Sequence, residues 1–146
     1  MPRPILIALL LVAPSAFAQA PTMKQLMLDL IHPASNSILL ASYRGGPADE
    51  KDWADLRHSA LTLMESANLL AARGPAGLNT ASSGQSSSTA WAASAKMLTD
   101  AAAAAYKAAQ DRDPKALAAL TVRIDASCTS CHKQYRPNVF PPGGSK

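Results

Sequence analysis

Residues 113–136, DPKALAALTVRIDASCTSCHKQYR, combine a clear helix start with an apolar stripe that runs into two cysteines. Asp113 is a favourable N-cap residue, and Pro114 suits the first helical position because its missing N–H would have no partner there. Arg136-Pro137 ends the pattern, since the residue before a proline avoids the helical conformation. The stripe has the three-and-four spacing of an amphipathic helix, and its residues are Leu117, Leu120, Ile124, Cys128, Cys131 and Tyr135.

The segment Cys128-Thr129-Ser130-Cys131-His132 has the C-x-x-C-H pattern of covalent haem attachment. Cysteines three residues apart share one face of a helix, so both sulfurs can reach the two vinyl groups on one side of a porphyrin. His132 follows directly and can place its imidazole under the iron. The motif therefore predicts one covalent haem c, held by Cys128 and Cys131, with His132 as an axial ligand.

Other uses of the two cysteines fit this pattern less well. A disulfide between Cys128 and Cys131 would close a very short loop and constrain the unfolded chain little. A catalytic dithiol usually opens a helix in a βαβ unit, which this sequence lacks. A zinc site would need further ligands, whereas His32 and His58 fall in other predicted helices. Haem attachment is the preferred interpretation, and zinc and a redox dithiol are the alternatives.

The pattern Thr22-Met23-Lys24-Gln25 has the form of a capping box and predicts the start of the first helix. Pro33 should kink or interrupt this helix, so one bent helix and two short helices both fit the pattern. Gly45-Gly46 is a stop signal. The predicted inner stripe consists of Met23, Leu26, Met27, Leu30 and Ile31, and it resumes at Ala34, Ile38 and Ala41.

Two further helices are predicted between these ends of the chain. The first starts after Pro47 among acidic residues and ends at Arg73-Gly74, with Trp53, Leu56, Ala60, Leu63, Met64, Ala67, Leu70 and Ala71 as its stripe. Residues 74–89 predict a mobile loop. The second starts at about Thr89, with Trp91, Met97, Leu98, Ala101, Ala102, Ala105 and Tyr106 inward. Together these patterns predict an all-α, antiparallel four-helix bundle with the haem attached near the C-terminus.

Residues 1–18 have the features of a cleaved export signal. Arg3 supplies the positive start, Ile5 to Val12 an apolar run, and Ala16-Phe17-Ala18 a small-residue cleavage site, with Ala20 as a second choice. The run is too short for a membrane anchor. We expect one domain over residues 19–146, located in the periplasm. The chain has 14 Lys and Arg against 10 Asp and Glu, without a run of like charge that would suggest nucleic acid.

The attachment motif, its continuation Lys133-Gln134-Tyr135-Arg136 and its place on the last of four helices resemble the class II c-type cytochromes, the cytochrome c′ and cytochrome c-556 family. The resemblance implies that Arg136 lies near the haem edge and that its charge acts on the side of His132. It also implies that the residue over the other face of the iron comes from the first helix. That residue would be methionine in low-spin members and a bulky non-ligand in cytochrome c′ members.

Met27 is the preferred candidate for this second iron ligand, because it lies on the inner stripe after Lys24-Gln25, which is similar to the family's first helix. An ordinary core methionine is the alternative. Met23, His32 or a vacant position would also fit, although His32 beside Pro33 is predicted to be a surface or kink-associated histidine. His58 is predicted to face solvent. Met64 and Met97 are predicted core residues.

The sequence shows no catalytic cluster, so we expect an electron-transfer or haem-binding protein rather than an enzyme. A methionine ligand favours a carrier that exchanges electrons with redox protein partners. The alternative is a five-coordinate protein that binds nitric oxide or another small gas, with Leu26, Met27 or Leu30 crowding the open face. Trp53, Trp91 and Tyr106 would shield the haem. The resemblance also implies a possible homodimer.

Overall fold

The structure is a computed structural model that describes residues 20–75 and 85–136. Its elements in chain order are α1 (Met23–Gln25), η1 (Leu26–Ile31), α2 (His32–Tyr43), α3 (Glu50–Arg73), α4 (Gln85–Asp111) and α5 (Pro114–Tyr135). The predicted export signal, most of the predicted loop before Thr89 and the tail from Pro137 onward lie outside the described residues. No helix of the described part is long and apolar enough to cross a membrane.

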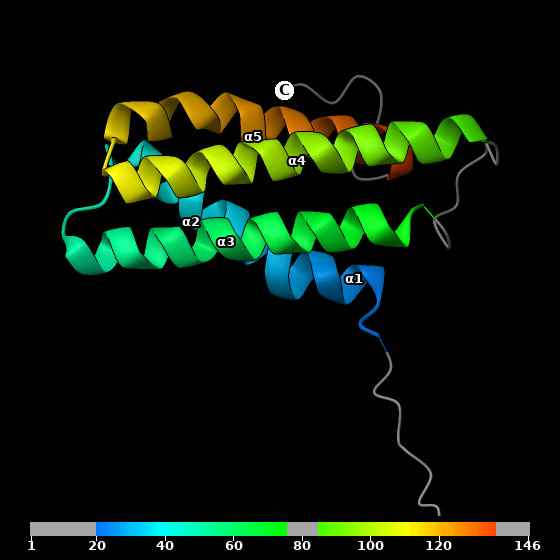
Figure 1. The fold of residues 1–146 in the computed structure, drawn as a ribbon, viewed down its shortest axis with the longest axis horizontal. Coiled ribbons are helices and arrows are strands. Elements are labelled where there is room, and N and C mark those ends of the chain that lie inside the picture. Colours follow the sequence, from blue (N-terminus) through cyan, green and yellow to red (C-terminus); the bar gives the residue numbers. More distant parts are fainter. Residues whose placement is uncertain (1–19, 76–84, 137–146) are drawn as a thin grey trace, which may run out of the picture.

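Segments α1, η1 and α2 follow one another without a break, so the described chain forms an all-α four-helix bundle, as the sequence predicted. Figure 1 shows α3, α4 and α5 running lengthwise, with α1 and α2 packed along them. Three side-chain contacts fix how neighbours align: Ser37 to Ser59 across α2 and α3, Trp91 to Leu70 across α4 and α3, and Ser42 to Thr121 across α2 and α5. The last joins the two hydroxyl oxygens at 2.8 Å.

The predicted starts of the first and last helices are confirmed by their caps, whereas α4 begins at Gln85, four residues before the predicted start at about Thr89. Thr22 and Gln25 make the reciprocal bonds of a capping box. The Asp113 carboxylate accepts from the backbone N–H groups of Lys115 and Ala116 ahead of the first turn of α5. Gly46 ends the turn after α2 with a φ of +114°, and a Cβ there would lie 2.9 Å from the Cβ of Pro114. Glycine is therefore required at position 46 both by conformation and by space.

The helix that contains Pro33 is one continuous element with a wide turn in it. Residues Leu26–Ile31 form a π-helix, and the backbone N–H of His32 donates to the carbonyl of Met27, five residues back. Proline lacks an N–H, and its ring would press on the carbonyl four residues earlier in an α-helix. We attribute the wide turn directly before Pro33 to this conflict. The sequence predicted a disturbance here but not its form.

The wide turn changes which residues face inward. Leu26 and Ile31, five residues apart, are both buried, with 1% and 5% of their surface exposed. Leu30 is 36% exposed, so its predicted place on the inner stripe is wrong. The prediction assumed α-helical spacing, whereas a hydrogen bond between residues five apart stacks such residues on one face.

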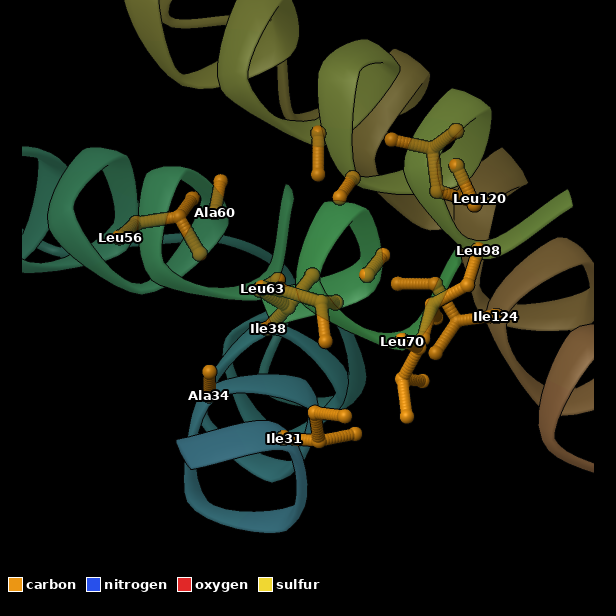
Figure 2. Packing of buried hydrophobic residues seen from close by; sticks show 14 of the residues in the cluster. Ile31, Ala34, Ile38, Leu56, Ala60, Leu63, Leu70, Leu98, Leu120 and Ile124 are labelled. Carbon is orange, nitrogen blue, oxygen red and sulfur yellow. The ribbon is translucent and has the colours of Figure 1, made fainter. Parts of the chain in front are cut away.

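The core is a single cluster with contributions from every helix of the bundle. Figure 2 shows Leu70, Leu98 and Ile124, from α3, α4 and α5, converging in it. Alanines 101, 102, 105, 108 and 109 of α4 are also buried, which lets α4 approach its neighbours closely. Two predicted core residues are wrong: Met97 is 45% exposed and Ala71 is exposed, since each is one residue off the buried stripe of its helix. Met64 is only partly buried.

Candidate haem-binding site

A cavity of about 390 Å³ lies between α5, α4 and the continuous helix formed by α1, η1 and α2. Most of its lining is apolar, with Ile31, Leu39, Leu70, Trp91 and Leu98 among the residues that face it. The wall contributed by α5 contains the whole attachment motif, because Cys128, Cys131 and His132 all line the cavity. The motif therefore opens onto an apolar space, and both cysteines also pack against the core cluster.

Both cysteines are free thiols and partly buried. Burial raises the pKa of the Cys128 thiol, and burial with the neighbouring Cys128 raises the pKa of Cys131 to about 11. Both thiols are therefore protonated at neutral pH. The net addition of each S–H across a vinyl group of a haem would give a thioether. The two side chains fit the attachment of a haem in their position, chemistry and charge.

His132 lies one turn from the end of α5 and is partly buried. Burial, followed by the positive charge of Arg136, lowers the pKa of its imidazole below the usual range. The neutral imidazole keeps a lone pair on one ring nitrogen, which is the form that binds a metal. Arg136 also lines the cavity, and its backbone N–H donates to the His132 carbonyl at 2.7 Å. Arg136 thus lies beside His132 at the cavity, and its place near a haem edge stays a prediction.

The opposite wall is formed by the continuous helix around the wide turn. Met27 lines the cavity and also packs against the core, and its role as an iron ligand stays a prediction. Leu28, Ile31 and His32 line it as well. Met23 packs against the core but is absent from the cavity lining, which leaves it the weakest of the predicted ligand candidates.

The prediction that His32 is a surface or kink-associated histidine is confirmed, and the structure adds a second feature. This residue is exposed, as expected for a surface histidine, but it also lines the cavity. The π-type hydrogen bond from His32 to Met27 places the two residues one wide turn apart on the same face. Sequence spacing alone could not show this, because five residues in an α-helix separate two faces. His58 is exposed, as predicted.

The family model described as cytochrome C′ matches residues 45–136, which is more than half of the chain. The chain belongs to the cytochrome c′ family. No curated protein and no solved structure matches it. The family match covers α3, α4, α5 and the attachment motif, and it begins after the helix that carries Met27 and His32.

As a cytochrome c′ family member, the chain is a c-type haem protein, and its cavity fits that group. The donor set is two thiols and one neutral imidazole on a single helix face, opposite a wall that offers a thioether. The zinc alternative has less support. In residues 20–75 and 85–136, no group of three or more His, Cys, Asp or Glu side chains could hold a metal ion.

Several cavity residues of this cytochrome were not foreseen as site residues, and Leu28 and Ser94 are two of them. Leu28 was not placed on the inner stripe, and it reaches the cavity because the wide turn spreads neighbouring residues over one wall. Ser94 of α4 lies in the lining among apolar residues, and nothing in its sequence context points to a site. Trp91 lines the cavity as its predicted shielding role requires, whereas Trp53 and Tyr106 pack elsewhere in the core cluster.

Proposed function

We propose that this protein is a periplasmic electron carrier with one haem c, bound through thioethers to Cys128 and Cys131 and ligated by His132 and Met27. The observation that carries the proposal is the facing arrangement of these four residues around one apolar cavity. When bound, the haem supplies a one-electron couple between ferric and ferrous iron. The electrons come from and pass to redox protein partners, and no substrate is transformed.

Each wall has a distinct role in this proposal. Cys128 and Cys131 would hold the haem on α5, and the same helix places His132 beside them. Met27 contributes a soft thioether, which stabilises the ferrous state relative to a second imidazole. Leu70, Leu98 and Ile31 exclude water, which favours the less charged form of the site.

Leu28 supports a second candidate function. It lines the same wall as Met27, directly next to it, and a leucine has no atom that binds iron. With Leu28 rather than Met27 over the iron, the open face would accept nitric oxide or carbon monoxide. The protein would then be a five-coordinate gas binder rather than a carrier.

The test is the optical and resonance Raman spectrum of the purified holoprotein and of the variant Met27→Ala. If Met27 is a ligand, the wild type is low spin, and the variant becomes high spin and binds carbon monoxide readily. Leu28→Ala is the matched control and should leave the low-spin spectrum unchanged. A high-spin wild type that Met27→Ala does not alter would exclude the carrier proposal and favour the gas binder.

Export is tested separately. We expect the mature protein in the periplasmic fraction, beginning at Gln19 or Pro21 by mass spectrometry. A full-length chain retained in the cytoplasm would contradict this location.

A further inference from the structure

Serine hydroxyls from three helices line the cavity, and one of them differs from the other two. Ser35, Ser94 and Ser127 are all buried, with 6%, 7% and 2% of their surface exposed. The Ser35 hydroxyl donates to the His32 carbonyl at 3.1 Å, and the Ser127 hydroxyl donates to the Ile124 carbonyl at 2.8 Å. Both are therefore satisfied within their own helices. Ser94 makes no hydrogen bond with any residue in 20–75 or 85–136.

The absence of a partner for Ser94 is informative because a serine within a helix has a partner available. Ser66 donates to the carbonyl of Thr62, and Thr99 to that of Ala95, each four residues back. Among the described residues, no fully enclosed side-chain nitrogen or oxygen lacks a partner, so the Ser94 oxygen must be open to the cavity it lines. The Ser94 hydroxyl is therefore available to an occupant of the cavity or to a group that turns toward it.

The packing of α4 against α5 indicates which group this is. The rings of Trp91 and Tyr135 meet edge to face, with centroids 4.8 Å apart. The two helices are antiparallel and are joined by a short turn. Three residues from Trp91 toward that turn along α4 is Ser94, and three residues from Tyr135 toward the same turn along α5 is His132. A step of three residues is close to one helical turn and keeps the same face. Ser94 and His132 therefore lie at one level and face the same cavity.

We propose that Ser94 is a positioning residue for the axial histidine: its hydroxyl oxygen accepts a hydrogen bond from Nδ1–H of His132 when Nε2 binds the iron. This inference rests on the proposed ligation by His132. A ligand histidine needs a partner for its second ring nitrogen, because that bond fixes the tautomer and the ring orientation and makes the imidazole a stronger donor. The proposed hydrogen bond between Ser94 and His132 does not depend on whether Met27 binds the other face of the iron.

The test compares the ferric holoprotein with Ser94→Ala by proton NMR, following the hyperfine-shifted Nδ1 proton of His132 and its exchange with deuterated water. We expect exchange at least tenfold faster in Ser94→Ala, because the proton loses its acceptor. The weaker imidazole donor should also favour the ferrous state by up to about tenfold, a rise of about 59 mV in the one-electron potential. Ser94→Thr keeps the hydroxyl and should restore both values toward the wild type.

Ser35→Ala is the matched control, since it removes a buried cavity hydroxyl that already has a partner on its own helix. We expect its Nδ1 exchange and potential to match the wild type. Equal exchange rates and potentials in Ser94→Ala and wild type would overturn the proposal, and so would equal changes in Ser35→Ala. Unfolding midpoints show that each variant is folded. A wild-type spectrum without a histidine ligand would instead be a failure of the proposed coordination.

Discussion

The two walls of the cavity differ in how they are built. The α5 wall is a regular α-helix with a strong cap at Asp113, and its functional residues follow one another within five positions of the sequence. The opposite wall contains a π-helix before a proline, and three side chains of that wide turn reach the cavity together with His32, which follows it. The regular helix of the first wall presents one set of functional residues at a fixed spacing. The irregular turn of the second wall brings several different side chains to the same cavity.

The largest effect is expected from breaking the α5 wall. The double variant Cys128→Ala/Cys131→Ala, expressed with haem-attachment machinery, should retain no haem after denaturation and acid extraction, because no thiol remains to form a thioether. Absorbance of the extracted polypeptide measures this directly. Ser130→Ala, an exposed residue between the two cysteines, is the control and should keep its haem. Haem that resists extraction from the double variant would disprove attachment at this motif.

Substitutions in the opposite wall should act on the stability of the fold rather than on haem attachment. Leu26→Ala removes a side chain that is 1% exposed, and we expect it to lower the free energy of unfolding by about 2–5 kcal/mol. Leu30→Ala should lower the free energy of unfolding by well under half of that amount, because Leu30 is 36% exposed. Denaturation with urea measures both values. Equal losses would mean that the segment is an ordinary α-helix and that Leu30 faces inward after all.

The sequence revealed the α5 wall almost completely because its signals are local. Asp113-Pro114, the apolar stripe and the C-x-x-C-H motif each depend on spacing within one regular helix, and the structure kept that spacing. The helix ends at Thr22, Gly46 and Gly74 were also predictable, since capping and positive φ depend on a few adjacent residues.

The opposite wall could not be predicted to the same degree. Pro33 signalled a disturbance, but whether the chain answers with a kink, a break or a wide turn depends on packing against the rest of the bundle. Leu28 and His32 reach the cavity only because of the turn that formed. The open hydroxyl of Ser94 depends on contacts between α4 and α5, which no pattern within α4 contains.

The smallest of the expected effects concerns the α4 side of the cavity, which is shared by both walls. The Trp91 ring N–H donates to the Leu70 carbonyl at 2.7 Å, and the N–H of Gly74 donates to the same carbonyl at 3.3 Å. Because that carbonyl keeps one partner, loss of the indole bond in Trp91→Phe should cost only about 1 kcal/mol beyond the loss of ring volume.

Trp53→Phe is the matched control for this measurement, since Trp53 is also buried and makes no hydrogen bond with the described residues. The difference between the two free energies of unfolding isolates the indole bond. No difference would show that the contact between α3 and α4 rests on packing alone.

The wide turn at Leu26–Ile31 also bears on how such a chain can evolve. Between the buried residues Leu26 and Ile31, the turn holds one residue more than an α-helix would need, so a single deletion there would leave both residues facing the core. Met27 and Leu28 then stand side by side at the cavity, one able to bind iron and the other not. A lineage could exchange a carrier for a gas binder by shifting a single residue across this turn, without repacking its core.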